Sequence, residues 1–314
     1  MRLVCFVKDW LKKNPDMEST FLAETGIKPR MLDNLRRDDV NWRLERDQIE
    51  AMMLFGYRHS IPEIFSIQHH PLWATFDSSP ALLFRGAPRW DAKIEEELSG
   101  FLEHMGGSPR SVTNPPTVAG IEKAMKEANC IFVGSPKSNP ATEIAICLLA
   151  GARPFDPKKS NRDNLPVQML VAEPPPEPSA VLFVDHPYGF SVRGKRGKRE
   201  HIGAHWLSPK EYESWHGEAE DSAVVIIRRS PLDTEEPVTT IIVMGYSGLA
   251  TQTAMFELMK GADLPLKESQ LESRKTQILA YHFQFEKPKR ITKSRRDPRR
   301  VIPETGTWWP PAPR

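Results

Sequence analysis

The chain has 314 residues, with 43 lysines and arginines against 41 aspartates and glutamates, for a formal net charge of +2. This length accommodates a small domain followed by a larger one. Charged residues make up 27% of the chain and hydrophobic residues 39%, which excludes a protein that is disordered throughout. No apolar run approaches the roughly 20 residues that span a bilayer, so no membrane partner is expected.

The cysteines and histidines predict a cytoplasmic protein with no metal site and no cofactor. Cys5, Cys130 and Cys147 are odd in number and lack Cys-x-x-Cys spacing. Cys130 and Cys147 lie in apolar stretches, which favours buried and reduced thiols. The N-terminus is too interrupted by charge to be a secretory signal. The histidines are scattered, and none has the spacing of a tetrahedral metal site.

Residues 1–68 contain short helical patterns that predict an all-α domain. In "FLAETGIKPRML", residues 21–32, one helical pattern reaches Gly26 and a second begins near Ile27. This segment resembles phage-repressor-like helix-turn-helix domains, with Gly26 at the tight turn. The small alanine of that family falls on Leu22 here.

The resemblance implies that the second of these helices lies in the major groove of double-stranded DNA, and that a homodimer contacts two half-sites. Arginine suits guanine edges and asparagine suits adenine edges, because each offers paired hydrogen bonds. The alternative is a helical cap whose charges form a solvated face, since acids nearly balance bases in this segment. The residues predicted to bind DNA are Lys28, Arg30, Met31, Asn34, Arg36 and Arg37.

Residues 69–286 alternate between strand and helix patterns, which predicts a mixed-sheet α/β (Rossmann-like) domain with helices on both faces. A hairpin-like run over residues 165–245 predicts an antiparallel or mixed section. The expected strands cover residues 81–86, 130–134, 165–171, 179–186, 221–229, 238–245 and 276–286, and the expected helices cover residues 90–106, 117–129, 141–151 and 249–261.

Two basic segments have two interpretations each. Residues 193–200, "RGKRGKRE", either clamp nucleic acid or a phosphate, or form an exposed hairpin tip. Residues 287–314 are predicted to be a basic C-terminal tail that contains proline and tryptophan. This tail either adds phosphate contacts or is a mobile end.

Two strand–turn–helix junctions predict a ligand site. They are "IFVGSPKSNPATE", residues 131–143, and "IIVMGYSGLATQTA", residues 241–254. Ligands of open α/β sheets bind at the carboxyl ends of the strands. If these two strands are neighbours, both turns border one crevice, which suits a small polar or nucleotide-like ligand. The alternative is two tight turns with ordinary helix caps. The predicted ligand-binding residues are Gly134, Ser135, Ser138, Asn139, Thr142, Gly245, Ser247, Gly248 and Thr251.

Residues 139–155, "NPATEIAICLLAGARPF", resemble a segment of nucleoside 2-deoxyribosyltransferase-like nucleotide-binding folds. The resemblance implies that Glu143 is the nucleophile or contacts the ribose, because attack at an anomeric carbon needs a positioned anion. The sequence therefore predicts a DNA-binding transcriptional regulator whose α/β domain senses a small polar or nucleotide-like ligand. The alternative is a nucleotide- or nucleoside-processing enzyme, an N-glycosidase or deoxyribosyltransferase-like protein, with a DNA-binding accessory domain.

Overall fold

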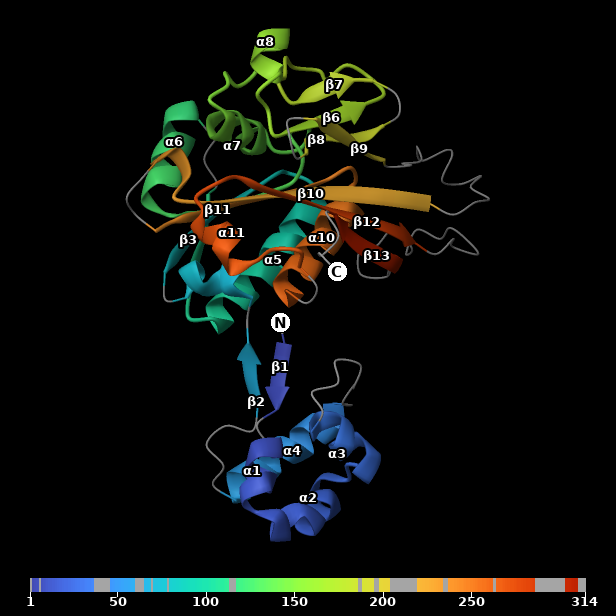
Figure 1. The fold of residues 1–314 in the computed structure, drawn as a ribbon. Helices are drawn as coiled ribbons and strands as arrows, with labels where there is room; N and C mark the ends of the chain where they lie inside the picture. The colour runs from blue at the N-terminus through green and yellow to red at the C-terminus, as the bar shows by residue number, and fades with distance from the viewer. Residues whose placement is uncertain are drawn as a thin grey trace. The chain divides into compact units, whose positions relative to one another are not determined.

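The computed structural model describes residues 2–5, 7–36, 46–59, 65–68, 70–77, 79–112, 117–185, 188–194, 198–203, 219–233, 237–261, 264–285 and 303–309. The contacts within the chain divide it into two compact units, Met1–His70 and Pro71–Arg314. Both units appear in Figure 1, and each is described by itself. Within the described ranges, no helix combines the length and the apolar character needed to cross a bilayer.

The N-terminal unit packs its helices around a small apolar core. Its elements are β1 (Arg2–Cys5), α1 (Val7–Lys13), η1 (Pro15–Met17), α2 (Glu18–Thr25), α3 (Pro29–Arg36), α4 (Arg46–Arg58) and β2 (Phe65–Gln68). β1 and β2 pair antiparallel, so the prediction of an all-α unit was wrong. The β-prone residues Val4 and Ile67 lie in these paired strands. The core side chains are Leu11, Phe21, Ile27, Leu32, Met52 and Phe55.

The second unit is a mixed α/β fold built on a seven-stranded sheet, which confirms the predicted class. The strand order is β13-β12-β10-β11-β5-β3-β4. β3, β4, β5 and β11 run parallel, whereas β10 is antiparallel to both β11 and β12. The bounds are β3 (Pro80–Arg85), β4 (Ser108–Ser111), β5 (Asn129–Val133), β10 (Ala219–Arg229), β11 (Thr239–Gly245), β12 (Gln277–Phe285) and β13 (Pro303–Trp309).

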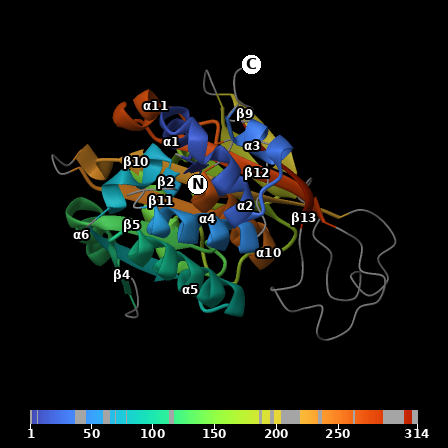
Figure 2. The ribbon, with the colours of Figure 1, turned by 90° about the horizontal axis from the view of Figure 1, so that it is seen from below.

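Helices cover both faces of this sheet (Figure 1). α5 (Arg89–His104) and α10 (Gly248–Lys260) pack against each other on one face, which Figure 2 views from below. α6 (Val118–Glu127) and α7 (Pro140–Ala150) cover the other face. Because side chains alternate along a strand, Ile131 of β5 joins the core of the first face and Phe132 joins the core of the second. The short helices are η2 (Pro71–Phe76), α8 (Lys159–Arg162), η4 (Pro231–Asp233) and α11 (Glu268–Glu272).

A four-stranded sheet forms a further layer on the side of α6 and α7 (Figure 1). Its order is β7-β6-β8-β9, and its bounds are β6 (Val167–Val171), β7 (Leu182–Val184), β8 (Gly189–Arg193) and β9 (Arg199–Gly203). Phe190 and Val192 of β8 share a buried cluster with Val224 and Ile226 of β10. The same cluster contains Cys130 and Cys147, which are free and buried, as predicted.

The C-terminal segment is not only a basic tail. Residues 303–309 form β13, which pairs antiparallel with β12. The ring of Trp308 packs edge-on against that of Tyr281, with centroids 4.9 Å apart. A Cβ at Gly306 would lie 2.0 Å from the Tyr281 hydroxyl oxygen, so glycine allows this close approach. The strand forms because pairing with β12 partly buries its aromatic side chains. The polar residues around them would gain no such burial.

Candidate functional site at the carboxyl edge of the parallel strands

Three strand–turn–helix junctions lie at one edge of the seven-stranded sheet. β3, β5 and β11 are adjacent and parallel, and each is followed by a glycine-containing turn and a helix. The backbone N–H of Gly134 donates to the carbonyl oxygen of Val243 at 3.0 Å, so the turn after β5 is bonded to β11. α7 leaves to one face, whereas α5 and α10 leave to the other. Ligands of open α/β sheets bind where successive helices leave on opposite faces.

The turn between β5 and α7 is held by buried polar side chains. Asn139 donates through Nδ2 to the carbonyl oxygens of Phe84 at 3.0 Å and Val133 at 2.9 Å. Its Oδ1 accepts from the backbone N–H of Ala141 and so caps α7. Thr142 donates to the carbonyl oxygen of Gly134 at 2.8 Å. The polar groups of Asn139 and Thr142, both predicted to bind a ligand, are therefore used in hydrogen bonds that hold the turn.

The turn between β11 and α10 is held in the same way. The Gly245 N–H donates to Thr251 Oγ1 at 2.9 Å, and that hydroxyl donates to the carbonyl oxygen of Ser247 at 3.1 Å. Ser247 Oγ accepts from the N–H of Ala250 at 3.1 Å as the N-cap of α10, and it also donates to Asp221. The hydroxyl groups predicted to bind a ligand here are buried and bonded within the fold.

The predicted ligand residues thus separate into two groups. Ser135, Ser138 and Gly248 are half-buried and lie on the rim of the two turns. The Ser138 hydroxyl lies 3.1 Å from the carbonyl oxygen of Ser135 and 3.4 Å from Asp91 Oδ2, and it can donate to only one of them at a time. The buried group consists of Gly134, Asn139, Thr142, Gly245, Ser247 and Thr251.

Asp91, in the first turn of α5, is an acidic group at this edge that was not among the predicted residues. Its side chain is only 2% exposed, and it accepts hydrogen bonds from Ser138 and from the backbone N–H of Gly86. Burial raises the pKa of Asp91 to about 6, although these hydrogen bonds and the charge of Arg85 act in the opposite direction. A Cβ at Gly86 would lie 2.5 Å from the carbonyl oxygen of Ser138, and Gly134 has a φ of 102°, so both turns need glycine.

Asp221, near the start of β10, is a second buried carboxyl group. It is fully buried and accepts hydrogen bonds from Ser247 Oγ and from the N–H of Ser222. Burial raises the pKa of Asp221 to about 7, against the lowering effect of both hydrogen bonds. Carboxyl groups with pKa values this close to neutrality are enriched at functional sites. Asp91 and Asp221 therefore make this edge the candidate site.

Glu143 has a different environment from that of a catalytic nucleophile. Its side chain is buried in α7 and accepts hydrogen bonds from the N–H of Phe155 at 2.9 Å and of Ala180 at 2.7 Å. Its second oxygen accepts from the Ser179 hydroxyl. These bonds fasten α7 to the segment before β7. The geometry favours a structural role for Glu143, because a nucleophile needs a carboxylate oxygen that can reach a substrate.

In the N-terminal unit, α2 and α3 are joined by a tight turn. Gly26 ends α2 in the left-handed conformation, with φ 66°. Ile27 and Leu32 are buried, whereas Lys28 and Arg30 are exposed at the start of α3. Of the other predicted DNA-binding residues, Met31 is half-buried, Asn34 and Arg36 lie in α3 with side chains outside the description, and Arg37 lies outside the described residues.

Comparison of the chain with protein-family models, with curated proteins and with solved structures finds no match. In the described part of the chain, no group of three histidine, cysteine or acidic side chains could hold a metal ion.

Proposed function

We propose that this protein is a DNA-binding transcriptional regulator, with a helix-turn-helix unit in Met1–His70 and a Rossmann-like, ligand-sensing unit in Pro71–Arg314. The observation that carries the proposal is the junction of α2 and α3. Two eight-residue helices meet at a left-handed glycine, and the second begins with exposed basic residues. This is the arrangement that places the start of a second helix in a major groove.

The charges around this junction support a role in binding phosphates and bases. Glu24 of α2 forms an ion pair with Arg58 and lies 3.5 Å from Nε2 of His59, so this acid is already occupied. Lys28 and Arg30 lie on the exposed side of the α3 start, opposite the buried Leu32. Arginine can contact guanine with two hydrogen bonds, and lysine can contact phosphate. A homodimer would present two such helices to two half-sites.

Ligand sensing is assigned to the edge formed by the turns after β3, β5 and β11. On the rim, the Ser138 hydroxyl lies 3.4 Å from Asp91 Oδ2, and burial raises the pKa of Asp91 to about 6. A small polar or nucleotide-like ligand that donates hydrogen bonds to Asp91 would favour its ionised form. Ligand binding regulates DNA affinity only if the ligand prefers one of two states of the protein.

The double substitution Lys28→Ala with Arg30→Ala tests the DNA-binding proposal. We expect it to weaken binding of the full chain by about tenfold or more, because a lost base contact costs roughly 1–3 kcal/mol. The DNA is a duplex that the wild-type chain selects from a random-sequence pool, and affinity is measured by fluorescence anisotropy.

The matched control is Lys13→Ala, which removes an exposed lysine from the last turn of α1. This variant should retain wild-type affinity, and the melting temperatures of all three proteins should agree. Equal affinities of the wild type and the double variant would contradict the proposal, as would failure of the wild type to select any duplex.

A further inference from the structure

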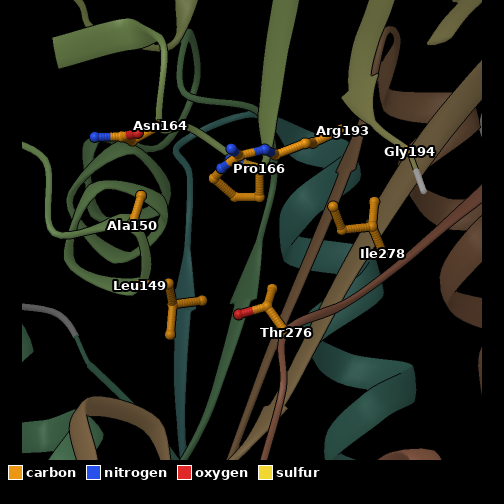
Figure 3. A pocket seen from close by; sticks show the side chains of 8 residues that line it. All are labelled: Leu149, Ala150, Asn164, Pro166, Arg193, Gly194, Thr276 and Ile278. Carbon is orange, nitrogen blue, oxygen red and sulfur yellow. The ribbon is translucent and has the colours of Figure 1, made fainter. Parts of the chain in front are cut away.

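A cavity of about 410 Å³ lies between the end of α7, the start of β6, the end of β8 and the start of β12 (Figure 3). β12 runs parallel to β11, so its start lies at the opposite edge of the sheet from the turns after β5 and β11. Small-molecule sites in proteins have volumes of roughly 300–1,000 Å³. The lining combines the apolar Leu149, Ala150 and Ile278 with the polar Arg193, Asn164 and Thr276.

Arg193 is held beside another arginine. It ends β8 directly opposite Arg199 of β9, and like charges in that position destabilise a sheet. Arg199 is engaged within the fold, since it donates to Ser191 Oγ at 2.8 Å and to the carbonyl oxygens of Leu165 and Ser191. Burial lowers the pKa of Arg199, and the charge of Arg193 lowers it further, whereas Asp163 acts in the opposite direction.

The guanidinium of Arg193 does not form hydrogen bonds like those of Arg199 within the described part of the chain. Among the described residues, none accepts a hydrogen bond from it or forms an ion pair with it. The carboxylate of Glu200 in β9 lies beside Gly194, the residue that follows Arg193. Figure 3 shows the nitrogens of Arg193 directed toward Pro166, on the α7 side of the cavity. Arg193 is exposed and lines the cavity, so its guanidinium can pair with a ligand there.

The end of α7 does not need Arg193 as a cap. Arg228 donates to the carbonyl oxygen of Leu149 at 3.4 Å. The N–H groups of Gly151 and Ala152 donate to the carbonyl oxygens of Leu148 and Cys147. Three of the last four carbonyl groups of this helix thus already have donors.

We propose that this cavity binds a small organic anion, whose carboxylate or phosphate pairs with Arg193 while its apolar body packs against Leu149, Ala150 and Ile278. The planar guanidinium offers two parallel hydrogen bonds to such a group. The Thr276 hydroxyl, which Figure 3 shows directed into the cavity, supplies a further donor. This site is separate from the edge near Asp91, and the inference does not depend on DNA binding.

Calorimetric titration of the full chain with 2-naphthoate tests this site. We expect binding with a Kd of about 1 mM or tighter, and weakening by about tenfold or more in Arg193→Gln, since a charge-assisted pair contributes at least ~1.4 kcal/mol. The neutral analogue 2-naphthamide should bind weakly and equally to both proteins. Ala150→Leu, which places extra carbon atoms at the cavity wall, should also weaken naphthoate binding.

Two controls separate binding from a structural role. Arg110→Gln removes an exposed arginine from β4 and should leave naphthoate affinity unchanged. Arg193→Gln should not lower the melting temperature, because it relieves the repulsion of Arg199. Unchanged naphthoate affinity in Arg193→Gln would overturn the proposal. So would tighter binding of inorganic phosphate than of naphthoate, or no binding of either up to about 10 mM.

Discussion

Gly245→Ala is expected to lower the free energy of unfolding by about 2–4 kcal/mol. A Cβ at this position would lie 2.2 Å from the backbone nitrogen of Thr251 and 2.5 Å from the carbonyl oxygen of Ser247. Both atoms belong to the backbone at the start of α10, so no side-chain rotation can relieve the clash. Overpacking alone costs roughly 1–3 kcal/mol. Moving this turn also breaks the hydrogen bond from Gly245 to Thr251, which adds about 1 kcal/mol.

The matched control is Gly100→Ala on the exposed side of α5, where a Cβ would meet no atom within 4 Å. The same chemical change should stabilise the protein here by about 0.5–1 kcal/mol, because alanine favours the helix. Urea unfolding of the three proteins measures both effects. A Gly245→Ala variant as stable as the wild type would show that the turn after β11 is not packed as described.

Asp221→Asn is expected to remove a large pH-dependent component of stability. The folded protein holds the pKa of Asp221 at about 7, raised by burial from the ordinary value of 3.8. Because the folded state binds this proton more tightly, the protein loses stability as the pH rises from about 4 to about 7. A difference of about three pKa units corresponds to about 4 kcal/mol at pH values above this window. Asparagine cannot ionise, so the variant lacks this loss.

Urea unfolding at about pH 5 and about pH 8 measures this component, and the wild type should lose roughly 3 kcal/mol more than Asp221→Asn between them. Asparagine retains an acceptor for the N–H of Ser222 and can donate to Ser247 Oγ, so the packing is conserved. Glu103→Gln, which neutralises an exposed acid on α5, should behave as the wild type does. Parallel pH profiles of the wild type and Asp221→Asn would refute the assignment.

The elements of the α/β unit could be predicted because their patterns are local. β5 and β11 are continuous apolar runs, and α5 carries its apolar side chains on one face. The place of β10 between β11 and β12 could not be predicted, because it depends on pairing between segments far apart in the chain. β13 was missed because prolines and charges dominate its surroundings, whereas its formation depends on contact with Tyr281.

The adjacency of the two turns was predicted, but the direction of their side chains was not. Glycine after an apolar strand is visible in the sequence, and the turns after β5 and β11 do follow adjacent parallel strands. The sequence does not show whether Asn139 and Thr251 point into the turn or toward a ligand, because the same side chains can cap helices and bind ligands. Asp91 and Asp221 follow no motif. Each is an acid beside an apolar element, and its burial depends on packing against distant segments.

The salt dependence of DNA binding by the wild-type full chain tests the central claim most directly. Fluorescence anisotropy with a random-sequence duplex should give a Kd in the micromolar range at about 50 mM salt, because phosphate contacts supply non-specific affinity. Affinity should fall by about tenfold or more when the salt is raised to about 200 mM. The reason is that releasing counterions from DNA contributes less free energy when the surrounding salt concentration is higher. Absence of binding at the lower concentration, or an affinity that does not change with salt, would contradict a DNA-binding function.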